Sequence, residues 1–214
     1  AFRPEDVIIP QSAIRSKKEI LQPQHLITLF TSSKTMYDRK VIDDPYINAY
    51  RFQVLTGFRP GELIALSPND VFGSTVHILR SKNIYGEITQ GKNEDAVRAY
   101  SLPPLAHDIL YEEMEKGCEY IFGIRSEPHY RNRWKAYCKY NGIPYIPPYN
   151  LRHTFVSVVK VLPEGAIKPI VGHSKNMDTF GFYGHYVEGD DKKVSSMIQG
   201  VFDGILKGAK EKVC

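Results

Sequence analysis

Apolar and polar positions follow two different periods along the chain, and the period changes twice. Before about residue 66, apolar residues recur three or four positions apart around residues 22–30 and 46–55 and in the segment GELIAL, which predicts short helices. The following segments TVHILRS, NIYGEITQ and VRAYSL alternate apolar and polar residues and contain a turn. They predict three strands of one small antiparallel sheet.

Helical spacing returns at Pro103 and continues to the C-terminal region. Two prolines open the segment PPLAHDILYEEMEKG and Gly117 ends it, as is typical of helix starts and stops. Further helices are predicted over residues 128–140, 151–161, 164–171, 176–182 and 192–206. The fold class predicted from this pattern is α+β, predominantly α-helical with a small antiparallel three-stranded sheet.

The predicted helix over residues 128–140 has two distinct faces. Helical spacing places Tyr130, Trp134 and Tyr137 on one face, and we expect these aromatic side chains in the core. A basic row lies on another face and consists of Arg131, Lys135 and Lys139. Such a row is either a solvated surface or a DNA contact, and we favour the solvated surface.

The composition is that of an ordinary globular domain. Hydrophobic residues make up 42% and charged residues 24% of the 214 positions, so the chain can bury a real core. No apolar run approaches the roughly 20 residues that span a bilayer, and no signal-peptide pattern opens the chain. We therefore expect a cytoplasmic protein that does not bind membranes. The formal net charge of +4 is too small to indicate a nucleic-acid partner by itself.

Neither the cysteines nor the acidic residues have the spacing of metal ligands. An odd number of cysteines without a Cys-x-x-Cys pair favours reduced thiols over a disulfide framework or a zinc site. The adjacent acidic pairs are interpreted as solvated charges, and the histidines form no His-Glu-x-x-His motif. We therefore expect no metal and no cofactor. The residues concerned are Cys118, Cys138 and Cys214, and the pairs Asp43-Asp44, Glu112-Glu113 and Asp190-Asp191.

Three side chains of complementary chemistry lie close together in the C-terminal sequence. Tyr183 follows His173 by ten residues in VGHSKNMDTFGFYGHY, and YNLRHTF places Arg152 upstream. A phenol has a pKa near 10, so holding it as a phenoxide at neutral pH costs roughly 4 kcal/mol, which fixed positive charge can supply. The same charge would bind a phosphodiester. The pattern therefore indicates covalent phosphoryl chemistry on nucleic acid, with the tyrosine as the nucleophile.

Two further cationic residues stand where the backbone is expected to be irregular. Gly57 and the Pro60-Gly61 pair flank Arg59 in LTGFRPGEL, which places Arg59 at a turn before a helix. Lys92 lies in NIYGEITQGKNEDAVRAYSLP, at a hairpin tip or strand edge. Taken singly, each residue is more typical of a solvated surface charge.

In combination and in this order, the motifs resemble the tyrosine recombinase (phage integrase) family. TGFRPGELIAL resembles its first arginine box, QGKNEDAVRAYSLP its lysine-bearing hairpin, NLRHTF its second arginine box, and VGHS and YGH its later histidine and its tyrosine. The resemblance implies the tyrosine recombinase catalytic-domain fold. It also implies that the catalytic residues are Arg59, Lys92, Arg152, His173 and the nucleophile Tyr183, with Arg98 at the following basic position.

The resemblance further implies a domain organisation and a set of partners. Residues 21–199 correspond to the catalytic domain, and residues 1–20 to a linker or arm that would connect to the family's amino-terminal core-binding domain. Residues 200–214 form a tail that either docks on a neighbouring protomer or folds back on its own core. The expected partner is double-stranded DNA, bound by a homo-oligomer, a tetramer, whereas the isolated chain could be a monomer.

One catalytic position departs from the usual pattern of the family. The residue three before the second arginine is commonly histidine, and here it is Tyr149. A phenol can donate or accept a hydrogen bond, but with a pKa of about 10 it is a poor general base at neutral pH. The departure leaves open which group removes the proton of Tyr183.

The residue types fit the reaction that the resemblance implies. Arg59 and Arg152 can bind a phosphodiester through paired N–H groups as charge grows on its equatorial oxygens. Lys92 would protonate the leaving 5′-oxygen, and His173 would donate a hydrogen bond to the phosphate. Attack by Tyr183 would leave a 3′-phosphotyrosyl bond and a free 5′-hydroxyl. Reversal would reseal the strand without ATP or a metal.

The sequence thus predicts a site-specific DNA recombinase, the integrase of a mobile genetic element. Two alternatives stay open. The first is a DNA-binding or regulatory module with this fold but impaired catalysis, which Tyr149 would explain, and the second is a related topoisomerase. Glu62 is either an exposed acid at a helix start or a support for a catalytic arginine. His153 and His185 are interpreted as structural residues.

Overall fold

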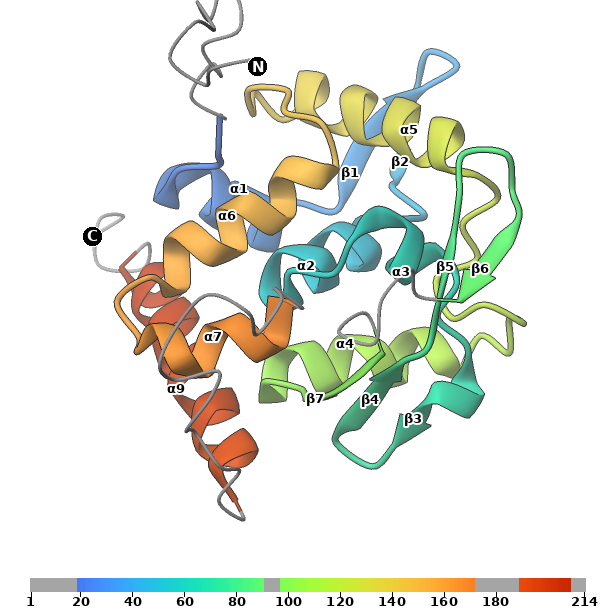
Figure 1. Ribbon diagram of the computed structural model, residues 1–214. Coiled ribbons are helices and arrows are strands. Elements are labelled where there is room, and N and C mark those ends of the chain that lie inside the picture. The colour runs from blue at the N-terminus through green and yellow to red at the C-terminus, as the bar shows by residue number, and fades with distance from the viewer. Residues whose placement is uncertain (1–18, 91–96, 172–188, 209–214) are drawn as a thin grey trace, which may run out of the picture.

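The structure is a computed structural model that describes residues 19–90, 97–171 and 189–208, and its helices surround a central helix, α2 (Figure 1). The predominantly helical α+β class predicted from the sequence is confirmed. The helices of the described residues are α1 (Pro23–Thr31), α2 (Ile47–Thr56), α3 (Pro60–Ile64), α4 (Pro104–Met114), α5 (Glu127–Tyr140), α6 (Tyr149–Val159), α7 (Glu164–Val171) and α9 (Asp190–Lys207), with a short 3-10 helix at Pro68–Asp70.

The strands of the described residues form three separate antiparallel sheets. One is a three-stranded sheet in the order β3-β4-β7, and the other two are the pairs β1-β2 and β5-β6. The strands are β1 (Lys34–Tyr37), β2 (Lys40–Asp43), β3 (Val71–Phe72), β4 (Thr75–Ile78), β5 (Arg80–Lys82), β6 (Ile88–Gln90) and β7 (Arg98–Ser101).

The predicted three-stranded sheet is correct in number of strands but wrong in one member. The strand in NIYGEITQ is β6, which pairs with β5 in the register Lys82↔Ile88 and stays outside the three-stranded sheet. A tight turn explains this, because the backbone N–H of Gly86 donates to the carbonyl of Asn83 at 3.0 Å and returns the chain onto β5. The third strand of the larger sheet is β3, which pairs with β4.

The core is built around α2, most of whose side chains are buried. A helix that is covered on all sides carries apolar residues around its whole circumference, and α1, α4 and α6 pack against this one. The predicted aromatic face of α5 is confirmed, because Tyr130, Trp134 and Tyr137 are fully buried. The ring centroids of Trp134 and Tyr50 lie 4.8 Å apart. The basic row of α5 is exposed.

Two acidic residues interpreted as solvated charges are buried, so that interpretation is wrong for them. Asp44 and Glu113 are 2% and 3% exposed. The Asp44 carboxylate accepts a hydrogen bond from the backbone N–H of Tyr46 at 3.0 Å, and Glu113 accepts one from Asn48 Nδ2 at 2.8 Å. Partner groups from the fold therefore replace water around each carboxylate, which adjacent-residue spacing does not reveal.

The C-terminal helix α9 continues through residue 200 without a break and packs against α1, α4 and α6. Phe202 is fully buried, so the described part of the tail lies on the core of its own chain. Docking of the tail on a neighbouring protomer stays a prediction. Within the described ranges, no helix has the length and apolar character needed to cross a membrane.

Candidate active site

Two glycines shape the turn that presents Arg59 at the start of α3. Gly57 ends α2 with a φ of +69°, and a Cβ there would lie 2.4 Å from Cδ1 of Phe155 on α6. A Cβ on Gly61 would lie 2.3 Å from Oγ of Ser81 on β5. Both distances are too short for a side chain, so only glycine allows the turn to contact α6 and β5 directly. The turn that the sequence predicted around Arg59 is confirmed.

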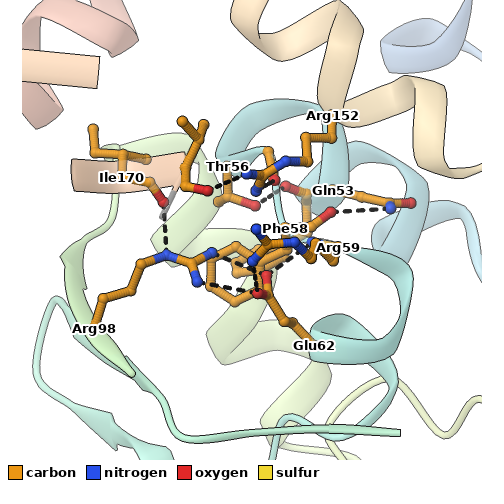
Figure 2. Close-up of polar contacts among 11 residues, drawn as sticks. Gln53, Thr56, Phe58, Arg59, Glu62, Arg98, Arg152 and Ile170 are labelled. Carbon is orange, nitrogen blue, oxygen red and sulfur yellow. Dashed lines mark hydrogen bonds and ion pairs between the residues drawn. The ribbon is translucent and has the colours of Figure 1, made fainter. Parts of the chain in front are cut away.

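Glu62 lies in the first turn of α3 and is only 5% exposed. Its Oε2 accepts the backbone N–H of Arg59 at 2.9 Å, and its Oε1 accepts Nη1 of Arg59 at 2.7 Å (Figure 2). Burial penalises the charged carboxylate, but hydrogen bonds from Arg98 and Arg59 outweigh burial and hold the pKa of Glu62 below its ordinary value. Glu62 is therefore a buried support for Arg59 and not an exposed acid.

Arg98 begins β7 and binds the same carboxylate from another side (Figure 2). Its Nη1 donates to Oε1 of Glu62 at 3.0 Å, and its Nη2 donates to Oε2 at 2.9 Å. Its Nε donates to the carbonyl of Ile170, near the end of α7, at 2.7 Å. Glu62 thus receives hydrogen bonds from two guanidiniums, one from the N-cap residue of its own helix and one from a residue 36 positions away.

Arg152 reaches this region from a third segment, α6. The residue is 3% exposed, and its Nη1 donates to the carbonyl of Gly57 at 2.9 Å, across 95 positions of the sequence. Its Nη2 donates to the carbonyl of Val171. Burial and then repulsion from Arg59 lower the pKa of Arg152 to about 10, so it stays cationic at neutral pH. The structure therefore brings together the two arginines that the sequence placed in separate motifs.

Tyr149 is the first residue of α6 and also contacts Arg59. The two side chains share a hydrogen bond, which the phenol oxygen accepts because a guanidinium has only donors. Burial disfavours the charge of Arg59, yet its bonds to Glu62 and Tyr149 raise the pKa of Arg59 above its ordinary value. Tyr149 is 42% exposed, and its ring packs edge-on against that of His153, with the ring centroids 5.3 Å apart.

We call Arg59, Glu62, Arg98 and Arg152 the arginine cluster. Glu62 is ion-paired to Arg59 and Arg98, and Arg152 lies close enough to interact electrostatically with Arg59 and Glu62. These four side chains carry an excess of two positive charges. The Arg59 side chain is 33% exposed, whereas that of Arg98 is 8% exposed. The arrangement can bind a tetrahedral anion such as a phosphodiester, because guanidinium N–H groups match the oxygens of phosphate in geometry and charge.

A buried polar network supports the turn that carries Arg59. Gln53 Nε2 donates to the carbonyl of Phe58 at 3.1 Å, and the hydroxyl of Tyr130 donates to Gln53 Oε1 at 2.9 Å. Gln53 was not among the predicted site residues. The signal that could have revealed it is a polar residue between the apolar residues Phe52 and Val54, shortly before the first arginine motif.

Three predicted site residues lie outside the described residues, so their positions stay predictions. Of the predicted set, the structure brings together Arg59, Tyr149 and Arg152. Within residues 19–90, 97–171 and 189–208, no group of three or more His, Cys, Asp or Glu side chains could hold a metal ion. Within the same ranges, Cys118 and Cys138 are free thiols. The predictions that fall outside the described residues concern Lys92, His173, Tyr183, His185, Cys214, residues 1–18 and the predicted helix over residues 176–182.

Comparison with known proteins gives similarity at the level of structure. No protein-family model matches the chain, and no curated protein matches it. The Tn1549 transposon integrase, in complex with transposon right end DNA, matches with a TM-score of 0.63 and 18% identity over 90% of this chain and 69% of that one. XerA recombinase matches with a TM-score of 0.53 and 20% identity over 88% and 68% of the two chains.

A third solved structure is the XerH site-specific recombinase bound to difH substrate, with a TM-score of 0.52 and 18% identity over 78% of this chain and 50% of that one. At these identities the similarity concerns the fold. The described part of this chain therefore has the tyrosine recombinase catalytic-domain fold, as the sequence motifs predicted.

Proposed function

We propose that this protein is a site-specific DNA recombinase, the integrase of a mobile genetic element, which cleaves and rejoins DNA strands through Tyr183. The observation that carries the proposal is the meeting of Arg59 and Arg152, from two motifs far apart in the sequence, beside Tyr149. Two proteins of the same fold, the Tn1549 transposon integrase and XerH recombinase, were solved bound to DNA, which supports the same kind of substrate.

The arginine cluster would act on the scissile phosphate. Its excess of positive charge would stabilise the charge that grows on the equatorial oxygens as the nucleophile attacks. Loss of one such donor costs on the order of 3 kcal/mol of barrier height. The same field favours ionisation of a nearby phenol, and this is the condition that the nucleophile Tyr183 needs.

The remaining steps of the proposed reaction belong to residues outside the described ranges. Tyr183 forms the 3′-phosphotyrosyl bond and the 5′-oxygen leaves with a proton from Lys92, while His173 donates a hydrogen bond to the phosphate. Reversal with another 5′-hydroxyl rejoins the strand, so the reaction needs no ATP and, in this proposal, no metal.

The proposed partner is double-stranded DNA, bound by a homo-oligomer, a tetramer on DNA. Residues 21–199 would form the catalytic domain, with residues 1–20 as a linker and residues 200–214 as a tail. Because phosphate contacts release condensed counterions, binding is expected to weaken steeply as salt concentration rises.

A covalent trapping experiment tests the proposal. The substrate is a pool of nicked duplexes with randomised flanking sequence, since the nick lets a short 5′-hydroxyl fragment leave and traps the covalent complex. The wild-type protein is expected to form a complex that survives denaturation, and Tyr183→Phe is expected to bind DNA without forming one. Tyr186→Phe is the matched control and is expected to behave like the wild type. Trapping of Tyr183→Phe, or no trapping of the wild type, contradicts the proposal.

The second candidate function is a DNA-binding module with impaired catalysis, and the position of Tyr149 beside Arg59 is the observation that favours it. Replacing Tyr149 with histidine separates the two candidates. A large gain in covalent complex for Tyr149→His indicates that the natural site is impaired. An unchanged or lower yield indicates that Tyr149 belongs to a working site.

A further inference from the structure

Arg98 is bonded to two different helices at once. Its Nη1 and Nη2 donate to Glu62 on α3 at 3.0 and 2.9 Å, and its Nε donates to the carbonyl of Ile170 on α7 at 2.7 Å (Figure 2). Because the Arg98 side chain is only 8% exposed, these contacts are made away from solvent, where hydrogen bonds to a charged group are strongest. Arg98 therefore connects β7, α3 and α7 through one guanidinium.

The end of α7 is held by two arginines in succession. The carbonyl of Ile170 accepts from Arg98, and the next carbonyl, that of Val171, accepts from Arg152. The last carbonyls of a helix have no partner within the helix and carry partial negative charge, so cationic donors stabilise them. The end of α7 is thus bonded directly to both buried arginines, and through Glu62 it is linked to Arg59.

Only a guanidinium can make this set of bonds. Paired donation to the two oxygens of Glu62 and a third bond from Nε to Ile170 use the planar fork of arginine. A lysine ammonium keeps the charge of Arg98 but places its donors at a single point. Replacing Arg98 with lysine would therefore keep the sign of the local field and lose the geometry.

We infer that Arg98 is a positioning residue, which fixes the guanidinium of Arg59 through Glu62 and fixes the end of α7 beside Arg152, so that both arginines meet one phosphate. This inference rests on the proposed function, because it assigns Arg98 a part in the same site. Arg98 acts through other residues and does not itself contact the DNA.

The variant Arg98→Lys, compared with a matched control, tests the inference. The control is Arg80→Lys, since Arg80 is also a strand arginine that is ion-paired to a buried acid, Asp70, and also donates to Ser67 Oγ at 2.9 Å. It lies outside the arginine cluster. DNA recovered from covalently trapped wild-type protein serves as the substrate for both variants.

The rate of covalent complex formation in a single turnover and the dissociation constant for DNA are measured separately. Arg98→Lys is expected to slow covalent complex formation about 100-fold, because misplacement of a binding group by about 1 Å has an effect of this size. Its DNA affinity is expected to stay within about threefold of the wild type. Arg80→Lys is expected to change both quantities less than about threefold. Equal slowing by the two variants, or a loss of affinity that matches the loss of rate, overturns the inference.

A second measurement does not depend on DNA cleavage. The guanidinium N–H signals of Arg59, assigned by their absence in Arg59→Lys, report rotation of this group in nitrogen-15 NMR spectra. Separate, slowly exchanging signals are expected in the wild type and in Arg80→Lys, and merged signals in Arg98→Lys. Unchanged Arg59 signals in Arg98→Lys overturn the inference even if the protein cleaves DNA. If the wild type forms no covalent complex, the proposed function fails, and the NMR comparison still decides whether Arg98 positions Arg59.

Discussion

Two buried carboxylates of this chain meet arginines in different ways. Asp44 faces Nη2 of Arg133 at 3.4 Å, and burial raises the pKa of Asp44 above its ordinary value despite this contact. Glu62 faces two guanidiniums at 2.7 to 3.0 Å, and its pKa lies below the ordinary value. Both carboxylates are buried, so the number of nearby cations and their distance decide whether the pKa is raised or lowered.

We propose that the difference separates a structural ion pair from a site for an anion. One guanidinium against one carboxylate, as at Asp44, leaves no excess charge, and Arg133 also packs over the ring of Tyr37 at 4.4 Å. In the arginine cluster two positive charges remain after Glu62 is counted. A buried excess of charge lowers the stability of the fold, and a bound phosphate would offset this cost.

The largest expected effect is on strand cleavage. Arg152→Lys is expected to slow covalent complex formation about 100- to 1000-fold, because a lysine cannot donate paired N–H groups to the phosphate. Arg133→Lys, the matched change at the structural pair, is expected to leave the rate within about threefold of the wild type. Single-turnover trapping on nicked DNA measures both. Similar rates for the two variants would remove the distinction between the two arginine sites.

An intermediate effect is expected on stability. Glu62→Gln is expected to lower the free energy of unfolding by about 3 kcal/mol, because the buried guanidinium of Arg98 and the half-buried guanidinium of Arg59 lose their anionic partner. Asp44→Asn is expected to lower it by about 1 kcal/mol, since its contact with Arg133 is long and burial already penalises its charge. Urea denaturation with equal slopes for all three proteins checks the values. A larger loss for Asp44→Asn would reverse the comparison.

The smallest expected effect is a pair of opposite pH dependences. The pKa of Glu62 is lowered from 4.5, so the stability from its charged form is present above that value and is lost as pH falls through the folded-state pKa. The pKa of Asp44 is raised from 3.8, so its contribution is present below that value and is lost as pH rises through the folded-state pKa.

The measurement is the free energy of unfolding between about pH 3 and pH 7. The wild type is expected to lose stability relative to Glu62→Gln as the solution is acidified, and relative to Asp44→Asn as it is made less acidic. The difference in free energy of unfolding between the wild type and each variant is followed with pH. If both differences change in the same direction, the opposite pKa shifts assigned to Glu62 and Asp44 are contradicted.

Helices with clear end signals could be predicted from the sequence. The segment over residues 164–171 has the predicted bounds, and the helix predicted at 128–140 begins one residue earlier, at Glu127. The side chain of Ser126 accepts the backbone N–H of His129, which fixes this start. The hairpin β1-β2 was not predicted, because its turn uses Asp38 and Arg39 at positive φ and lacks the usual Asn-Gly signal.

In the candidate site, the sequence motifs identified Arg59 and Arg152, and the structure brings them together. The role of Glu62 could not be decided from sequence, because its burial depends on Arg98, which lies 36 positions away. The contacts of Arg152 with main-chain carbonyls, such as that of Gly57, were also invisible, since a pattern of side chains carries no information about where carbonyl groups point.

Gly61 has a consequence for how this sequence can diverge. A Cβ on Gly61 would lie 2.5 Å from the carbonyl oxygen of Lys82. The distance between α3 and the β5-β6 hairpin therefore depends on the absence of one carbon. Random drift could exchange many neighbours of the arginine cluster for residues of similar size. At position 61 every replacement available to the genetic code adds that carbon, and the hairpin would have to move away from the helix that begins beside Arg59.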